Sequence, residues 1–96
     1  MNQNIDIRKA EKLYYKVKRH YNMHEDDWEQ AWFDELEKLD TETARVDAHL
    51  FYTDDDTKDE IVAGIIDDIK GQTILQATQF FDESLDTLAV VYIIKK

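Results

Sequence analysis

The chain has 96 residues and a mass of 11.4 kDa, the size of one domain, and 43% of its residues are hydrophobic, as in an ordinary globular protein. It contains no cysteine, no proline and only two glycines, which excludes disulfide frameworks, thiolate metal sites, cysteine nucleophiles and glycine-rich phosphate loops. Asp and Glu number 22 against 12 Lys and Arg, and the resulting net charge of −10 repels nucleic acid and acidic membranes and attracts basic protein surfaces.

Residues 4–21 are predicted to form an amphipathic helix, because apolar residues recur at helical spacing from Ile7 to Tyr21. Residues 1–21 carry six basic and two acidic side chains, whereas residues 22–96 carry six basic and twenty acidic ones. This helix is therefore a cationic segment on a strongly anionic chain. Its basic stripe consists of Lys9, Lys12, Lys16 and Arg19.

Residues 24–40 are predicted to form a second helix, with Trp28 and Trp32 one turn apart on its apolar face. Tryptophans at this spacing are expected in the core, and a binding hot spot is the alternative. The break at 22–23 favours an antiparallel helical hairpin over a single bent helix. In such a hairpin the acids of the second helix would partly neutralise the basic stripe.

Apolar and polar residues alternate over 44–53, which is the period of a half-buried strand. The pattern favours a strand. A short helix beginning at Thr43 is the alternative, because Ala44, Ala48 and Phe51 share a helical face.

Residues 57–70 carry the signals of a helix with defined ends. Thr57 and Glu60 have capping-box spacing, and Gly71 stands where a left-handed C-terminal residue is expected. Asp67 and Asp68, near the end of this helix, are expected to be exposed and to oppose the helix dipole, which Lys70 partly offsets.

Two further strands are predicted at 73–81 and 87–95. The last strand is apolar on both faces, so it belongs in the middle of a sheet. The hairpin places 73–81 on one side of it, and a crossover through helix 57–70 places strand 44–53 on the other. The predicted fold is therefore α+β: two N-terminal helices followed by β-α-β-β, with strand order 1-3-2 and the C-terminal strand central.

The whole chain, 1–96, is predicted to be one domain, composed of a helical hairpin over 1–40 and a β-α-β-β portion over 41–96. The longest apolar run, 88–94, is too short to span a membrane, and the N-terminus lacks the apolar core of a signal peptide. A soluble, cytoplasmic protein is expected.

The aspartates at 54–56, with Asp59 and Glu60 close behind, are the first candidates for a metal site. The EF-hand spacing fails, because counting from Asp54 the glycine position is Asp59 and the bidentate glutamate position is Ile65. We interpret these acids as residues that cap the following helix and complement its dipole.

The three histidines, His20, His24 and His49, show no His-Glu-x-x-His pattern and are interpreted as structural or solvent residues. No metal and no cofactor is predicted. Ser84 is the only serine, and no Gly-x-Ser-x-Gly motif surrounds it. Paired carboxylates are too abundant here to indicate acid–base catalysis, so the protein is predicted not to be an enzyme.

Size and charge together favour a non-enzymatic binding protein that covers a basic surface or groove on a protein partner. In these two properties the chain resembles small acidic inhibitor proteins of bacteria and phages: DNA mimics, anti-restriction and anti-CRISPR proteins, antitoxins and immunity proteins. Two alternatives stay open. The basic stripe could bind nucleic acid, or it could dock on the acidic surface of another copy. The predicted partner-binding acids are Asp26, Asp27, Asp34, Glu37, Asp54, Asp55, Asp56 and Asp59.

Overall fold

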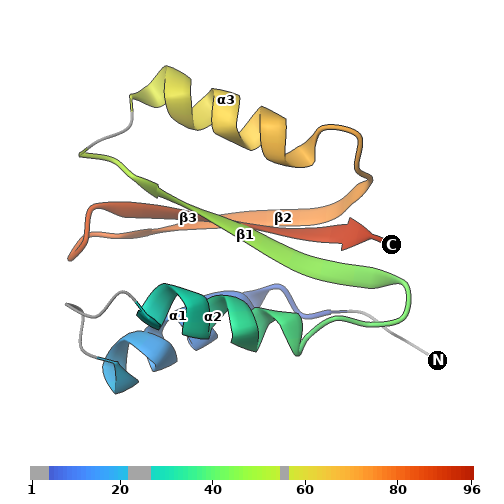
Figure 1. The fold of residues 1–96 in the computed structure, drawn as a ribbon, viewed down its shortest axis with the longest axis horizontal. Helices are drawn as coiled ribbons and strands as arrows, with labels where there is room; N and C mark the ends of the chain where they lie inside the picture. Colours follow the sequence, from blue (N-terminus) through green and yellow to red (C-terminus); the bar gives the residue numbers. More distant parts are fainter. Residues whose placement is uncertain (1–4, 22–26, 55–56) are drawn as a thin grey trace.

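The computed structural model of the chain describes residues 5–21, 27–54 and 57–96. It has three layers: two helices cover one face of a three-stranded sheet, and the third helix covers the other face (Figure 1). The elements, in chain order, are α1 (Arg8–His20), α2 (Asp27–Glu37), β1 (Ala44–Tyr52), α3 (Lys58–Ile69), β2 (Ile74–Asp82) and β3 (Thr87–Lys95).

The predicted topology is confirmed. The strand order is β1-β3-β2, and β3 pairs antiparallel with both neighbours. Residues 44–52 form a strand, so the helical alternative for this segment is wrong. The reason is tertiary: every residue of β1 lies opposite a residue of the apolar strand β3, from Ala44 opposite Lys95 to Tyr52 opposite Thr87. Pairing with β3 therefore outweighs the local helical pattern.

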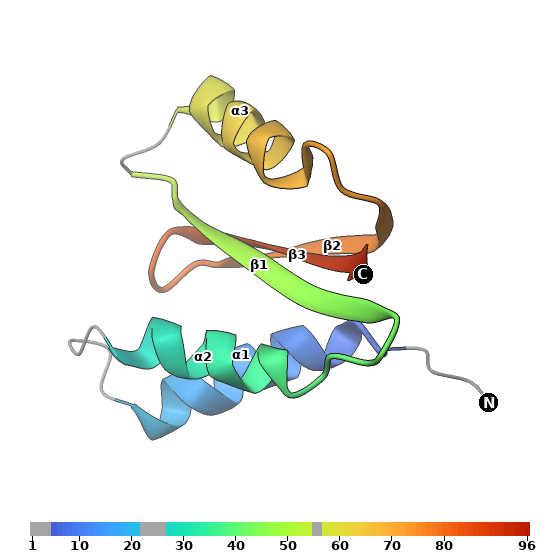
Figure 2. The same ribbon diagram turned by 45° about the vertical axis from the view of Figure 1, so that its right-hand side comes forward.

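The helices α1 and α2 form the antiparallel hairpin that the sequence predicted, and their apolar sides pack on one face of the sheet (Figure 2). Tyr14 and Trp32 are fully buried, and the ring of Tyr14 meets Trp28, Trp32 and Phe80 edge-on at centroid distances of 5.1–5.5 Å. Trp32 Nε1 donates a hydrogen bond to the carbonyl of Ala10 at 3.0 Å. Both tryptophans are therefore core residues, as predicted.

The ends of these helices differ from the expected ones. α1 begins at Arg8, and the Asp6 carboxylate accepts a hydrogen bond from the Arg8 backbone N–H at 3.1 Å. Tyr21 is already extended. α2 ends at Glu37, three residues before the predicted end. Any capping group within 22–26 lies outside the described residues.

The helix α3 covers the second face of the sheet, and both of its ends have the capping features that the sequence predicted. The Thr57 side chain accepts a hydrogen bond from Glu60 N–H at 3.2 Å, and Gly71 has a φ of +74° just beyond the helix. Its isoleucines pack on a small core of β1 and β3, yet none of its side chains is fully buried. That core consists of Phe51, Val90, Tyr92 and Ile94.

The expectation that both aspartates near the end of α3 are exposed is confirmed for Asp67 and wrong for Asp68. The Asp68 carboxylate is 30% exposed and lies 2.6 Å from His49 Nδ1 on β1. The imidazole of His49 stacks on the ring of Phe51, with centroids 4.1 Å apart. Because α3 lies over β1, the end of the helix that was expected to face solvent meets a partner there.

Gly64 allows α3 to approach β1 closely. A Cβ at this position would lie 2.8 Å from Cε1 of the buried Phe51 ring. We expect Gly64→Val to lower the free energy of unfolding by about 2 kcal/mol, because the helix or the ring must move. Ala63→Val, on the exposed side of the same helix, should cost less than about 1 kcal/mol. Urea denaturation of both variants measures the difference, and equal losses would contradict the close approach.

Tyr92 carries a buried hydroxyl that has no hydrogen-bond partner among the described residues. Burial, together with the charges of Asp68 and Asp47, raises the pKa of Tyr92 to about 12. Tyr92→Phe removes this unsatisfied group and should leave stability unchanged or raise it by up to about 1 kcal/mol. A thermal melt at neutral pH tests this expectation, and a loss above that size would reveal a partner for the hydroxyl.

Candidate functional site

A buried ion pair joins α1 to the end of β2. The Lys18 ammonium pairs with the Asp82 carboxylate, and these side chains are only 11% and 5% exposed. Tyr14 Oη donates a hydrogen bond to Asp82 Oδ2 at 2.7 Å, and Ser84 Oγ donates one to Asp82 Oδ1 at 2.7 Å. Every oxygen of this buried carboxylate therefore has a partner.

Burial and hydrogen bonding have opposite effects on the pKa of Asp82. Burial acts to raise the pKa of Asp82, but hydrogen bonds from Lys18, Ser84 and Tyr14 outweigh it and hold that pKa below its ordinary value. The pKa of Tyr14 is raised, first by burial and then by its hydrogen bond to Asp82. The cluster is thus a carboxylate held ionised in the protein interior.

This cluster has the residue types of a nucleophilic site but not the arrangement. Lys18 Nζ lies 2.8 Å from Ser84 Oγ, yet Lys18 is paired with Asp82 and is an unsuitable base. The Ser84 hydroxyl donates a hydrogen bond to the Asp82 carboxylate, which also accepts one from Tyr14. These bonds serve the structure, because they join three segments of the chain. The cluster therefore holds α1, β2 and the turn after β2 together.

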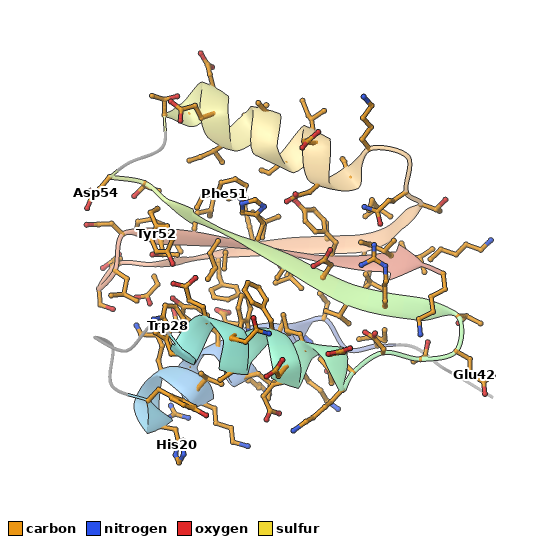
Figure 3. The ribbon with its side chains drawn as sticks, viewed as in Figure 1. His20, Trp28, Glu42, Phe51, Tyr52 and Asp54 are labelled. Atoms are coloured by element: carbon orange, nitrogen blue, oxygen red, sulfur yellow. The ribbon has the colours of Figure 1, made fainter. Side chains whose placement is uncertain are left out.

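At one end of the sheet β1 ends, α3 begins and β2 turns into β3 (Figure 1), and these segments carry exposed acids, of which Asp54 is labelled in Figure 3. The Thr53 N–H and hydroxyl both donate hydrogen bonds to the Asp86 carbonyl at 2.8 Å, so the two connections are held side by side. None of these acids forms an ion pair with another described residue, and Lys58 is the one base in the same connections. We call this group the acidic end; it consists of Asp54, Asp59, Glu60, Glu83 and Asp86.

The acids predicted from the sequence divide between two places. Asp54 and Asp59 belong to the acidic end, whereas Asp34 and Glu37 are exposed on α2, in the layer on the opposite face of the sheet. Asp34 accepts a hydrogen bond from the Gln30 side chain at 3.0 Å. Asp27 begins α2, but its side chain lies outside the described part of the chain, as do Asp26, Asp55 and Asp56.

Glu83 and Asp86 were missed by the sequence reasoning. They follow a strand more than twenty residues after Asp59, and only the pairing of β3 with both β1 and β2 brings the three acids to one end. The signal was available in the predicted strand order. Two strands that are both antiparallel to one central strand end at the same end of the sheet. The segments that follow them, which include Asp54 and Glu83, are therefore expected to lie close together.

The basic stripe on α1 is exposed along its length. The sequence suggested that acids of α2 would neutralise it, but the described residues of the two helices form no ion pair with each other. Lys18, which lies outside the stripe, pairs with Asp82 on β2, and Glu35 of α2 pairs with Lys38 of the following turn at 3.1 Å. The stripe therefore keeps its positive charge facing solvent.

The described residues contain no group of three or more His, Asp or Glu side chains arranged to hold a metal ion. Among the described helices, none is long and apolar enough to cross a membrane. Comparison of the chain with protein-family models, with curated proteins and with solved structures finds no match.

The Asp82 cluster makes a pH-dependent contribution to stability. Because its pKa is lower in the folded state than in the unfolded chain, the contribution is complete above about pH 4 and is lost as the pH falls through the folded pKa. Asp82→Asn leaves Lys18 buried without a counter-charge and should cost about 3 kcal/mol at pH 7. The difference from wild type should shrink towards pH 2.

Chemical denaturation at a series of pH values measures this difference. Asp34→Asn removes an exposed carboxylate on α2 and serves as the control, with an expected loss below about 1 kcal/mol. If the Asp82→Asn deficit stayed the same from pH 7 to pH 2, the carboxylate charge would not be what stabilises the cluster.

Proposed function

We propose that this protein is a small non-enzymatic binding protein whose acidic surface covers a basic surface or groove on a protein partner. The observation that carries the proposal is the acidic end, where five exposed acidic residues of the β1–α3 connection, the first turn of α3 and the β2–β3 turn form no ion pair among the described residues. Such a surface attracts a cationic partner over distances of about a Debye length.

The charge exceeds what solubility requires. A small domain remains soluble with a net charge of magnitude about 2–8, whereas this chain carries −10. Excess like charge destabilises the compact state, so the surplus supports a use in recognition. If the partner is a nucleic-acid-binding protein, carboxylates of this chain take the places of the phosphates that its basic groove normally meets, as in a DNA mimic.

A second function is supported by a specific observation. Lys9, Lys12, Lys16 and Arg19 are exposed on one helix without an ion pair to any described residue, which is the arrangement of a phosphate-binding surface. Its partner would be nucleic acid, or the acidic end of another copy. The net charge of the chain argues against nucleic acid, because the field of the whole molecule repels it.

Charge reversal separates these functions. A protein retained on the wild-type chain at low salt is identified, and its association rate is then measured with Asp54→Lys/Glu83→Lys and, as the matched variant, Lys12→Glu/Lys16→Glu. The acidic-end variant should associate roughly tenfold more slowly and with a weaker salt dependence. The α1 variant should bind as well as wild type or better.

Double-stranded DNA serves as the probe for the second function. If DNA binds the wild-type chain, and if the α1 variant loses DNA and the protein partner while the acidic-end variant keeps both, then the basic stripe carries the function. Circular dichroism spectra of both variants establish that each remains folded.

A further inference from the structure

The two edges of the sheet differ in how their backbone groups are satisfied. Three outward N–H groups in the first half of β1 donate to side chains of this chain, so this part of the edge is closed to another strand. Charged side chains and such coverage are common ways of protecting an edge. The three bonds run from Ala44 N–H to Thr41 Oγ1 (3.1 Å), from Val46 N–H to Asp40 Oδ1 (2.8 Å) and from Ala48 N–H to Asp47 Oδ1 (2.9 Å).

The same bonds fix which groups of β2 point outward. Val46 N–H points away from β3, so its partner Ile93 directs its own backbone groups towards β2. Ile93 lies opposite Gln76, which therefore pairs with β3. Alternation along the strand then turns outward the N–H and C=O groups of Ala77, Gln79 and Phe81.

Beyond the irregular pairing between Ile74 and Gln76, this outer edge of β2 lacks the usual protection. Residues 72–81 contain no charged residue and no proline, although 35% of the chain is charged. In the described part of the chain, no side chain donates to or accepts from the outward groups of Ala77, Gln79 and Phe81. The side chains of these three residues are exposed, and Phe81 is 46% exposed despite its size.

An apolar strip borders this edge on the α3 side. Gly64 faces Phe51 and Asp68 faces His49, so this side of α3 is turned towards β1. Val62 and Ile66 lie on the opposite side of the helix, away from β1. The described residues expose four large apolar side chains: Val62 (47%), Ile66 (59%), Leu75 of β2 (52%) and Phe81 (46%). We call Val62, Ile66 and Phe81 the apolar strip.

Helix packing and charge both act against a second copy of the chain at this edge. α1 lies over β2, since Tyr14 packs on Phe80 with centroids 5.1 Å apart and Lys18 pairs with Asp82 (Figure 2). If a second copy paired antiparallel with β2, its α1 would lie about one strand spacing, ~4.8 Å, from the α1 of the first copy. Two packed helices need an axis separation of about 8–10 Å. The net charge of −10 on each copy adds repulsion.

Charge indicates what does fit. Asp59 of α3 and Glu83 of the β2–β3 turn are exposed at one end of the edge, whereas Lys70 and Lys95 are exposed at the other. An added strand that carries basic residues beside Asp59 and Glu83 meets opposite charge there. An extended segment carries no helix layer, so α1 does not obstruct it.

We propose that the outer edge of β2 pairs with an extended segment of a partner protein, apolar at alternate positions and basic at the end beside the acidic end. Its backbone bonds to the outward groups of β2, and its apolar side chains cover the apolar strip. The inference rests on the proposed function only for the sign of the flanking charge.

The probe is a synthetic peptide that alternates valine and threonine and begins with two lysines. Its binding to the full chain is followed by amide chemical shifts, which should move along β2 and at the apolar strip. Gln79→Pro removes one outward N–H from an edge strand, a position where proline is tolerated. It should weaken the peptide roughly tenfold, whereas Gln79→Thr, which keeps the N–H, should bind like wild type.

Three results overturn the inference: equal binding by Gln79→Pro, shifts located away from β2, or self-association of the chain that Gln79→Pro abolishes, which would identify a second copy as the occupant. Asp54→Lys/Glu83→Lys distinguishes this inference from the proposed function. If Gln79→Pro loses the peptide and Asp54→Lys/Glu83→Lys binds it like wild type, pairing at β2 is supported. The same result overturns a contact between the acidic end and the basic residues of the peptide.

Discussion

The burial of β3 on both faces is the constraint on which the rest of the structure depends. Residues 89–94 are all buried, and a strand of this kind needs a partner on each side and a cover over each face. β1 and β2 supply the partners. The α1–α2 hairpin covers one face and α3 covers the other, so the order of the layers follows from one apolar strand. Most charged residues are left to the outer sides of the helices, the turns and the strand ends, and the buried Lys18–Asp82 pair is the exception among the described residues.

Much of this architecture could be predicted from the sequence, for reasons that lie in particular residues. The two-sided apolar pattern of 87–95 predicts a central strand, and the spacing of Trp28 and Trp32 predicts a buried helix face. Thr57 and Gly71 mark the two ends of α3. These signals are either local or depend only on the spacing of apolar residues along the chain, so a single sequence contains them in full.

The interactions that could not be predicted join residues far apart in the chain. Lys18 and Asp82 are 64 residues apart, and nothing in the sequence of either segment shows that they meet. One local signal existed: Lys18 stands one turn after Tyr14, at the border of the apolar face of α1, and a cation there needs a buried partner. Asp68 was misjudged for the same reason, because its partner His49 belongs to another element.

The attachment of α3 has a consequence for how the molecule opens. α1 and α2 each bury three side chains, whereas α3 buries none completely and is held by half-buried isoleucines and the contact between Asp68 and His49. Because the free energy of separating two surfaces scales with the apolar area between them, α3 is released at a lower cost than the whole fold. We therefore expect the amide hydrogens of α3 to exchange through a partly open state in which the sheet keeps its α1–α2 side covered and exposes the other face.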